Sequence, residues 1–526
     1  MDDTVKTEVE AELADMLQES LKRKRYLIVL DDIWSCEVWD GVSRCLPTDE
    51  NAGSRILLTT RNNEVARYAG TENLSMQMNF MDQDESWNLF KSAAFSNEAL
   101  SSLFETIGKQ ISEKCHGLPL TIVVVAGLLK SKRGIEDWGS IAKDVTSFIT
   151  NDPDEQCSHV LGLSYNHLTS DLKTCLLHFG IFPEDSEVPA KRLVRSWMAE
   201  GFLKLENDLE GEAEKCLQEL VDRCLVLVCK KSRDETKIRS CKVHDLIYDL
   251  CVREIQMESI FIMNDIVLGV SERGNLSMQK MQPYKRVTGD KIECHLYGLY
   301  RALLTPVHRQ LRDHDNNDLL ERTRSIFSFH LKYSSFIVKS ELIHFKLLKV
   351  LELRNIDMDH FPVQILSLIW LRYLLLHFRK KVDIPQEICR LWNLQTFIVQ
   401  GPSLWKITFP EEILGLMQLR HLELPEFYLP NPPSVSADKG SHMGFSNIQT
   451  ISYLSPCCCT KEFIMRIQKV KELGISAYQI DSDGPPLNNL VHLQQLETLS
   501  LTYRFGGFWP ASAKAFPATL KKLKLE

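Results

Sequence analysis

The chain has 526 residues, which is too long for a single hydrophobic core and predicts several domains. With 44% hydrophobic and 25% charged residues, its composition is typical of a folded globular protein and excludes a mainly disordered chain. The net charge of −8 argues against binding to a nucleic-acid backbone, because that activity needs a basic surface. We therefore expect no nucleic-acid partner.

The cysteines and the apolar segments indicate a cellular location. Fifteen cysteines are scattered without the spacing of a zinc site, which predicts reduced, mostly buried thiols. The acidic N-terminal segment does not have the basic start and apolar run of an export signal. The longest apolar stretch, residues 118–129, is shorter than the roughly 20 residues that span a bilayer and predicts a buried helix. These features predict a cytoplasmic protein with at most peripheral membrane association.

Residues 1–80 alternate strands and helices in the manner of a parallel α/β sheet. In "YLIVLDDIW", residues 26–34, four apolar residues lead directly into Asp31 and Asp32, as at the edge of a buried parallel strand. A second strand at 56–58 is followed by Arg61, and Asn62 can cap the next helix. A third strand is predicted at 74–80 from alternating apolar residues: Leu74, Met76 and Met78.

The next two segments are rich in helices. Residues 81–156 have helical apolar spacing and predict a helical domain, in which Gly117 ends one helix. Residues 157–262 combine helices with a β-hairpin, whose first strand is expected at 225–228, and therefore predict a winged-helix domain. DNA binding is not favoured, because the domain has a mixed-charge surface in an acidic chain. The expected core positions share helical spacing: Val160, Leu161, Leu168, Leu172, Cys175, Leu176 and Phe179.

The second half of the chain repeats the pattern LxxLxxLxL every 22 to 29 residues, which is the spacing of leucine-rich repeats. We expect about nine repeats over 321–526, after a linker and repeat start at 263–320. Because the sequence stops inside a repeat strand, we expect an incomplete C-terminus. One apolar anchor per repeat marks the register: Ile326, Leu351, Leu374, Phe397, Leu422, Ile451, Leu473, Leu499 and Leu523.

A second element recurs in three repeats, "FPVQI", "IPQEI" and "FPEEI". It places Pro362, Pro385 and Pro410 at the same phase, each followed three residues later by isoleucine. A generic array of helices would not place prolines in this way. The predicted fold class is therefore multidomain: a partial P-loop-type α/β domain, a helical domain, a winged-helix domain and a leucine-rich-repeat solenoid.

Five motifs stand in a fixed order before the repeats. They are "LIVLDDIW", "GSRILLTTRN", "GLPL" at 117–120, "CLLHFGIFPEDSEVPAKRLVRSWMAEGF" at 175–202 and "VHDL" at 243–246. In this order, the chain resembles the plant disease-resistance proteins of the nucleotide-binding, leucine-rich-repeat (NB-ARC–LRR) family. The sequences of these motifs are most similar to those of the coiled-coil class and its late-blight resistance subgroup. The resemblance covers nearly the whole chain.

The resemblance implies an innate immune receptor that acts as a switch. ADP would hold the nucleotide-binding module closed against the repeats. Recognition of a pathogen effector or of a guarded host protein through the repeats would allow exchange for ATP. The opened protein would then form a homo-oligomer and trigger the defense response, including hypersensitive cell death.

The resemblance also implies roles for single residues. Asp31 would hold Mg²⁺ and Asp32 would be the base that polarises the attacking water. Arg61 would sense the γ-phosphate, Pro119 would pack on the adenine, and His244 would contact the ADP β-phosphate. Val243 stands where the family usually has methionine, a conservative apolar change. The remaining motif positions would be structural: Gly117, Leu118, Leu120, Val243 and Asp245.

Each role has a purely structural alternative. Asp31 and Asp32 could merely end a strand, and Asp245 could be a helix N-cap with His244 as its satisfied neighbour. Gly117 and Pro119 could be only a helix stop followed by a helix start. At these positions the residue types alone do not decide between the two interpretations.

The sequence departs from the family at the phosphate loop. No G-x-x-x-x-G-K-[ST] motif occurs, and the single Gly-Lys pair, Gly108 and Lys109, is expected inside a helix. Without the backbone cradle and the lysine of that loop, the strongest triphosphate contacts are absent. We therefore expect an N-terminally truncated receptor, impaired in nucleotide binding, in which Asp32 is a vestigial base. We expect no enzyme, although the family has slow ATPase switch activity.

Two alternative functions are consistent with the same sequence. The first is an intact P-loop ATPase switch whose upstream region is missing from the chain. The second is a non-catalytic protein-binding or regulatory protein that acts through its leucine-rich repeats.

Overall fold

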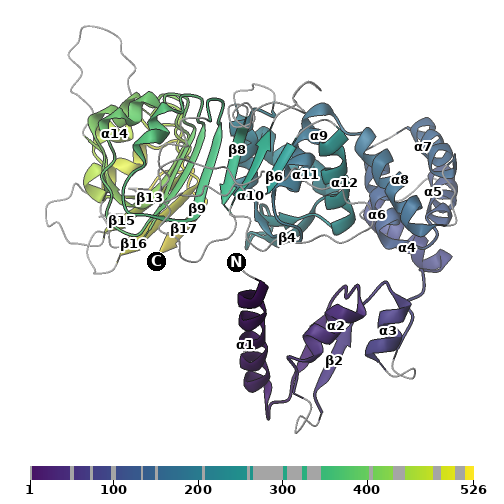
Figure 1. Cartoon of the computed structure of the whole chain (residues 1–526). Coiled ribbons are helices and arrows are strands. Elements are labelled where there is room, and N and C mark those ends of the chain that lie inside the picture. Colours follow the sequence, from purple (N-terminus) through teal and green to yellow (C-terminus); the bar gives the residue numbers. More distant parts are fainter. Residues whose placement is uncertain are drawn as a thin grey trace. The chain divides into compact units, whose positions relative to one another are not determined.

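The computed structural model describes residues 3–47, 53–70, 75–95, 102–131, 134–147, 152–203, 208–257, 261–264, 300–304, 323–328, 345–401, 407–430, 445–477, 487–503 and 516–525. The chain divides into two compact units, Met1–Phe80 and Met81–Glu526. The first unit contains a small parallel sheet with helices. The second contains helices, a small antiparallel sheet and a large repeat sheet (Figure 1).

The first unit is built around β1 (Leu27–Leu30) and β2 (Arg55–Leu58), which pair in parallel. Its helices are α1 (Asp3–Leu21), α2 (Cys36–Ser43) and α3 (Asn63–Ala69). The Asn62 side chain accepts a hydrogen bond from Glu64 N at 2.8 Å and so caps α3, which confirms the predicted cap.

The third strand predicted at 74–80 is wrong. Residues 75–80 form no strand, and Leu74 lies outside the described residues. The side chains of Met76 and Met78 are 88% and 87% exposed. A segment with alternating apolar residues forms a strand only when it can pair with a neighbouring strand and pack against a covering layer. In the first unit this segment does neither.

Four helices form the helical part of the second unit: α4 (Gln83–Phe95), α5 (Ser102–Lys114), α6 (Pro119–Lys130) and α7 (Ile135–Ser147). Phe90 and Trp138 meet edge to face at 6.2 Å in their shared core. The helix α6 is buried along most of its length, as predicted. Within the described parts of the chain, no helix is both long and apolar enough to cross a membrane.

The Gly108–Lys109 pair lies inside α5, as expected. A Cβ atom at Gly108 would come within 2.8 Å of the Trp87 ring. This glycine therefore serves the close packing of α5 on α4, and the pair is not a phosphate loop.

The winged-helix part has a three-stranded sheet in the order β3-β5-β4, with antiparallel neighbours. The predicted first strand is displaced by two residues, because Leu225 and Val226 belong to the core before the hairpin. The elements are α8 (Pro153–Asn166), α9 (Ser170–Leu177), η1 (His178–Ile181), β3 (Val188–Pro189), α10 (Ala190–Glu200), α11 (Leu209–Asp222), β4 (Leu227–Lys231), β5 (Ile238–Lys242) and α12 (Asp245–Met257).

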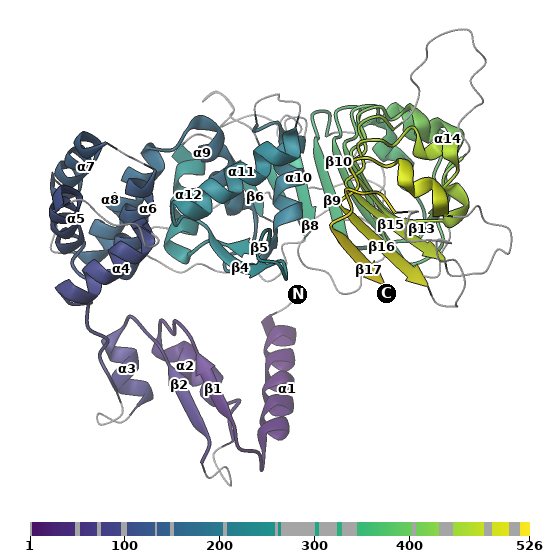
Figure 2. The same cartoon turned by 180° about the vertical axis from the view of Figure 1, so that it is seen from behind.

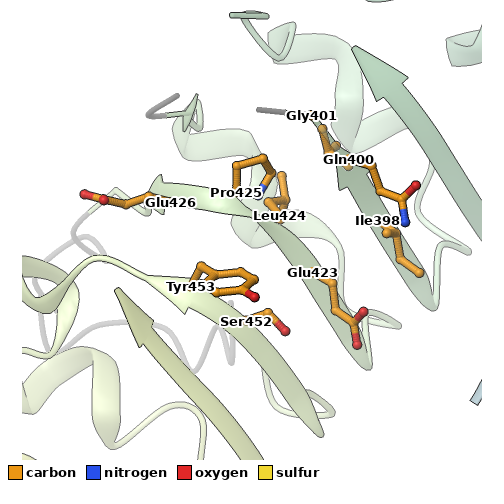
Figure 3. Close-up of a pocket in the computed structure, with 10 residues that line it drawn as sticks. Ile398, Gln400, Gly401, Glu423, Leu424, Pro425, Glu426, Ser452 and Tyr453 are labelled. Atoms are coloured by element: carbon orange, nitrogen blue, oxygen red, sulfur yellow. The ribbon is translucent and has the colours of Figure 1, made fainter. Parts of the chain in front are cut away.

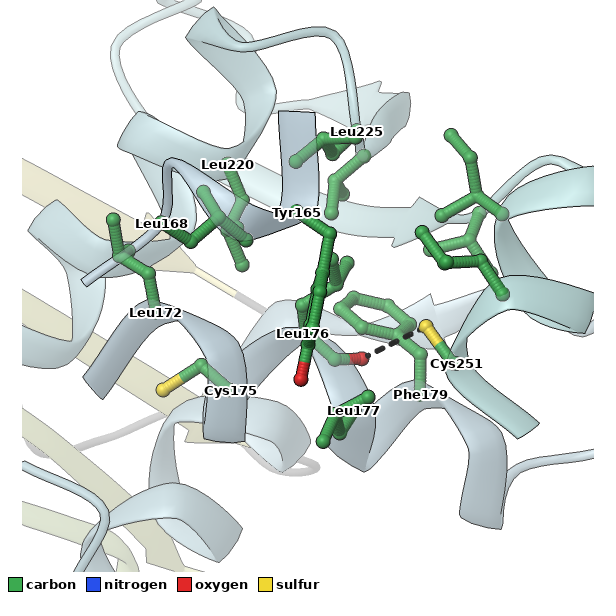
Figure 4. Close-up of a cluster of buried hydrophobic side chains, with 14 of the residues drawn as sticks. Tyr165, Leu168, Leu172, Cys175, Leu176, Leu177, Phe179, Leu220, Leu225 and Cys251 are labelled. Carbon is green, nitrogen blue, oxygen red and sulfur yellow. Dashed lines mark hydrogen bonds between the residues drawn. The ribbon is translucent and has the colours of Figure 1, made fainter. Parts of the chain in front are cut away.

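The core of this part joins α8, α9, α11 and α12 (Figure 4). All seven core positions predicted from helical spacing are buried, from Val160 to Phe179. The Cys251 thiol of α12 donates to the Leu176 carbonyl of α9 at 3.4 Å. The thiols of this core are thus packing groups, as the scattered cysteines predict.

The repeat sheet has the order β17-β16-β15-β14-β13-β11-β10-β9-β8-β7-β6, with β12 on β13, and its strands from β8 to β17 are parallel (Figure 2). These strands are β8 (Thr323–Ser328), β9 (Val350–Met358), β10 (Tyr373–Phe378), β11 (Thr396–Gln400), β12 (Ile407–Thr408), β13 (His421–Tyr428), β14 (Thr450–Leu454), β15 (Glu472–Ala477), β16 (Thr498–Tyr503) and β17 (Lys522–Leu525).

The register of the repeat sheet is the one predicted. Each anchor is the partner of the next across neighbouring strands, from Ile326 opposite Leu351 to Leu499 opposite Leu523. The anchors from Leu351 to Leu422 are completely buried. The predicted anchors are therefore confirmed.

The recurring prolines occupy the same position in their repeats, as predicted. Pro362, Pro385 and Pro410 directly precede the 3₁₀ helices η4 (Val363–Ser367), η5 (Gln386–Arg390) and η6 (Glu411–Gly415). The isoleucine of each motif is completely buried beneath its turn: Ile365, Ile388 and Ile413. Later repeats use η7 (Pro456–Cys458), α14 (Lys461–Ile464) and η8 (Leu487–His492).

Most of the predicted linker at 263–320 lies outside the described residues. The described part adds β7 (Tyr300–Leu304) to β8 and β6 (Phe261–Asn264) to β7, both antiparallel. The edge of the repeat sheet therefore begins with a short antiparallel extension.

Candidate functional site

The first candidate residues lie where β1 and β2 end. Thr59 N donates to Leu30 O at 2.9 Å, and Ile33 N donates to Thr59 O at 2.9 Å. The Thr59 hydroxyl accepts from Asp32 N at 2.9 Å and donates to the Asp31 carboxylate. Asp32 has a φ of 55°, in the left-handed region that aspartate tolerates better than most residues. Thr59 thus holds the Asp31 carboxylate and the Asp32 backbone, a role that the sequence analysis did not assign.

Arg61 lies beside this edge. Its Nε atom is 3.5 Å from Oδ1 of Asp32, and the two side chains are 62% and 60% exposed. Such an exposed pair contributes only about 0–1 kcal/mol to stability, so its importance would lie in its charge. The structure therefore brings Asp31, Asp32 and Arg61 together within the first unit.

The oxygen atoms at this edge fit a magnesium ion shared with a nucleotide. Mg²⁺ usually binds one or two carboxylates together with phosphate oxygens and water. Asp31, Asp32 and Thr59 supply hard oxygen donors of this kind. Among the residues that the structure describes, no group of three or more His, Cys, Asp and Glu side chains could hold a metal ion by itself.

The "GLPL" motif forms the turn between α5 and α6. Gly117 is buried, has a φ of 72° and accepts a hydrogen bond through its carbonyl from Met81 N at 3.1 Å. Leu118 is the N-cap residue of α6, and Pro119 occupies its first position. Pro119 is exposed, while Leu118 and Leu120 are half-buried. The helix stop and start proposed as the structural alternative is present, and it leaves the proline ring accessible.

The "VHDL" motif forms the start of α12. Val243 is buried, and the His244 carbonyl accepts from Tyr248 N at 2.8 Å. Leu246 N donates to Asp245 Oδ1 at 2.9 Å and lies 3.3 Å from His244 Nδ1, and this Nδ1 atom also contacts the Asp245 carboxylate. Because a carboxylate only accepts, Nδ1 is the donor of that pair. The His244 side chain is 40% exposed, so its ring is accessible at the start of α12.

Cys157 of α8 connects the starts of α6 and α12. The helix α8 packs on both α6 and α12. Burial raises the pKa of this thiol, and the negative charges of Asp154 and Asp245 add to the increase. Pro119 begins α6, and Asp245 begins α12 directly after His244. The second unit therefore brings its two candidate motifs to one region around a buried thiol, which no sequence signal indicated.

The winged-helix part also packs directly on the repeats. Residues next to each anchor point away from the solenoid core, and we call this side of the sheet the open face. The helix α10 lies against the open face near β9 and β10 (Figure 2). Several open-face residues belong to the same buried cluster as the winged-helix core: Val350, Tyr373, Leu375 and Ile398.

Charged residues surround this apolar contact. Arg192 Nε of α10 donates to Glu352 Oε2 at 2.9 Å, and the Glu352 side chain is completely buried. Arg195 pairs with Glu423. We call the charged residues together with His421 the latch interface: Lys191, Arg192, Arg195 and Glu210 on the winged-helix part, and Glu352, Arg420, His421, Glu423 and Glu472 on the repeats.

The charge pattern is reversed at α11, where the acid lies on the winged-helix side. Glu210 Oε1 accepts from Arg420 Nε at 2.6 Å and lies 3.3 Å from His421 Nε2. Burial alone would raise the pKa of Glu210, but its bonds to His421 and Arg420 lower it. Both sides of the interface therefore contribute cations and anions in alternation, which fixes one docking register.

The Glu423 carboxylate of the latch interface is ionised at neutral pH. Burial would raise the pKa of Glu423, but the Arg195 and Lys191 charges lower it to about 2. Removing one partner of such a buried pair leaves the other charge uncompensated, which costs about 3–5 kcal/mol. The latch interface is thus sensitive to loss of a single charge.

The carboxyl end of α10 is held by cations from the repeats. Lys349 Nζ donates to Glu200 O at 2.8 Å, and Arg372 Nη1 lies 3.4 Å from Ala199 O. Cations stabilise the negative end of a helix dipole. Gly201, with a φ of 80°, then ends the helix as predicted.

Comparison with known proteins agrees with these structural features. Residues 1–100 match the NB-ARC domain family, and residues 181–251 match the disease resistance protein winged helix domain. The chain belongs to the NB-ARC, leucine-rich-repeat disease-resistance proteins of plants. An NB-ARC domain implies nucleotide binding in general terms.

Within that family the chain is similar to late blight resistance proteins of Solanum demissum. Late blight resistance protein R1-A is 34% identical over 432 residues, which cover 81% of this chain and 32% of that protein. The homolog R1B-19 is 30% identical over 546 residues, which cover 98% of this chain and 39% of that protein. This chain thus spans well under half the length of these relatives. A solved leucine-rich-repeat protein of Leptospira interrogans matches 35% of this chain and 50% of its own, with 20% identity and a TM-score of 0.24.

Proposed function

We propose that the chain is the switch and recognition part of a plant innate immune receptor. The repeats would recognise a pathogen effector or a guarded host protein. Release of the switch would then start the defense response and the hypersensitive response, with a homo-oligomer as the active form. The place of action would be the cytoplasm, with at most peripheral membrane association. Family membership and the repeat architecture support this proposal.

The latch interface is the observation that carries the proposal. It joins the module that would change conformation to the surface that would bind the partner. A partner on the open face would compete with α10 and α11 for the same charged residues. Because the apolar contact and the ion pairs occupy one face, partner binding and the latched state would oppose each other.

The candidate nucleotide residues would supply the second control of the switch. Bound ADP or ATP with Mg²⁺ would provide the phosphate charge that distinguishes the two states. Asp31, oriented by Thr59, would hold the metal, and Asp32 would orient water near Arg61. Pro119 would offer its exposed ring to the adenine. His244 would present its imidazole ring to a phosphate while its Nδ1 contacts Asp245.

Nucleotide binding by this chain alone should be weak, because the 526 residues contain no phosphate-loop motif. Isothermal titration calorimetry with ADP and Mg²⁺ should give a Kd above the micromolar range, and ATP turnover should be at background. Micromolar ADP binding that His244→Ala abolishes, together with ATP hydrolysis, would contradict this part of the proposal.

Charge reversal in the latch interface tests the switch in plant tissue. Arg195→Glu faces Glu423 with a like charge and should increase ion leakage from leaves that express the chain without a pathogen. The double variant Arg195→Glu/Glu423→Arg should restore the unstimulated level. Arg239→Glu, an exposed residue on β5, is the matched control. Equal leakage from all four proteins would argue against a latch that restrains signalling.

A further inference from the structure

A cleft of about 300 Å³ lies on the open face of the repeat sheet, beside the latch interface. Its walls come from β11, β13 and β14 and the residues that follow them (Figure 3). Glu423 is part of the wall and also belongs to the latch interface. The cleft and the latch interface therefore share one carboxylate.

The strands that form the cleft are irregular at this point. The pairing of β13 with β14 shifts between Glu423 and Phe427, and the pairing of β14 with β15 shifts between Ile451 and Leu454. Within the second shift, Tyr453 has a φ of 58°, an unfavourable value for an aromatic residue. Bulges often re-aim a side chain at a functional site. Here the irregularity places the Tyr453 ring in the cleft with 41% of its surface exposed.

The neighbouring strand is adapted to this irregularity. A Cβ atom at Gly474 of β15 would come within 3.0 Å of Tyr453 N, so a larger residue would press on the turned backbone. The glycine thus allows the close approach that the unusual Tyr453 conformation requires.

The chemistry of the lining favours a cation. Of the ten lining residues none is basic, and Glu423 offers a partly exposed carboxylate. The Glu423 side chain keeps 27% of its surface exposed although Arg195 pairs with it, and its pKa is lowered. In Figure 3 the Ser452 hydroxyl lies between the Tyr453 ring and the Glu423 carboxylate. A planar guanidinium can donate to such oxygens and lie on an aromatic ring at the same time.

We propose that this cleft binds a cationic side chain, arginine in the first place, presented by a partner protein. The inference deepens the proposed receptor function and rests on it for the partner being a protein. A guanidinium in the cleft would share Glu423 with Arg195, whose side chain is only 6% exposed. Occupancy of the cleft would therefore weaken the latch interface, and loss of Arg195 would strengthen binding in the cleft, because the coupling is reciprocal.

The test uses the full chain and two small probes in NMR titrations. N-acetyl-arginine methylamide should bind, and the uncharged N-acetyl-citrulline methylamide should bind at least about tenfold more weakly, since a charge-assisted hydrogen bond is lost. Tyr453→Leu should weaken arginine binding about threefold by removing the cation–π contact, and Glu423→Gln should abolish it. Glu411→Gln, an exposed carboxylate on η6, is the matched control and should leave binding unchanged.

A third variant separates this inference from the proposed function. Arg195→Met should tighten arginine binding about tenfold if cleft and latch are coupled. If substitution of Glu423 or Tyr453 weakens arginine binding but Arg195→Met leaves it unchanged, the cleft binds arginine without coupling to the latch interface. That result would overturn its role in the switch. Equal binding of the two probes, or arginine binding unaffected by Glu423→Gln and Tyr453→Leu, would overturn the inference, even if charge reversal at Arg195 releases the latch.

Discussion

The parallel sheet of the first unit and the repeat sheet of the second are built from equally apolar strands, but their faces differ in burial. Leu27, Val29 and Leu57 are 70%, 57% and 55% exposed, whereas Leu374 and Leu376 are completely buried. A parallel α/β sheet needs covering layers on both faces. A repeat strand is covered by the turns of its own and adjacent repeats. An apolar run therefore predicts a strand, but the architecture around it decides its burial.

The largest expected difference concerns single leucines and valines in these two sheets. Leu374→Ala should cost about 2–5 kcal/mol, because it removes buried methyl groups and leaves a cavity. Val29→Ala should change stability by no more than about 0.5 kcal/mol, as at other exposed positions. Urea denaturation with hydrogen exchange resolved for each sheet would measure both. Equal losses at the two positions would remove the distinction.

A second comparison uses two glycines in the middle of helices. A Cβ atom at Gly127 of α6 would lie 2.5 Å from the backbone of Arg223, whereas one at Gly162 of α8 would meet nothing within 4 Å. Gly127→Ala should cost about 1–3 kcal/mol through overpacking. Gly162→Ala should stabilise by about 0.5–1 kcal/mol, since alanine is the better helix former. Thermal unfolding of both variants would measure these changes in stability. A Gly127→Ala protein as stable as the original would mean that Gly127 does not pack closely against the Arg223 backbone at the end of α11.

A third expectation concerns the stability of the folded protein at low pH. His178 is completely enclosed among Phe182, Phe202 and Phe327, and burial together with the Arg192 charge lowers its pKa to about 3. Because this value lies below that of the unfolded chain, the unfolded state binds the proton more readily below about pH 6.5, and stability falls as the pH decreases. His178 alone should cost about 2 kcal/mol at pH 5 relative to pH 7.

The variant His178→Phe isolates this contribution. It should flatten the decrease in stability between pH 7 and pH 5, as measured by urea midpoints. Burial and the Arg195 charge lower the pKa of His421 to about 4. This histidine therefore has the same direction of effect and should account for part of the remaining dependence of stability on pH. An unchanged slope in His178→Phe would show that this histidine is not buried in its neutral form.

Much of the fold could be predicted because its signals are local or periodic. The anchors from Ile326 to Leu523 repeat at a nearly constant spacing, so their register follows without knowledge of distant contacts. The Asn62 cap and the Gly201 helix end depend on residues next to them in the chain. The strand expected at 74–80 failed because alternation does not report whether a neighbouring strand exists.

The latch interface could not be predicted from the sequence. Lys191, Arg192 and Arg195 have the pattern of a solvated helix face, and Arg195 meets a glutamate 228 residues later. Nothing local distinguishes such a cation from a surface residue. The candidate nucleotide residues are an intermediate case. Their motifs named the candidates from the sequence, but the contacts of Thr59 and the position of Cys157 appeared only in three dimensions.

Hydrogen exchange of the α10 backbone amides in a double charge-reversal cycle tests the central claim most directly. Arg195→Glu and Glu423→Arg should each accelerate exchange at least about tenfold, because each leaves a like pair at a buried site. The double variant should return to within about threefold of the original rate if the two residues interact directly. If the α10 amides of the double variant exchanged as fast as expected from two independent single effects, the result would contradict a latch formed by the repeats and the winged-helix part.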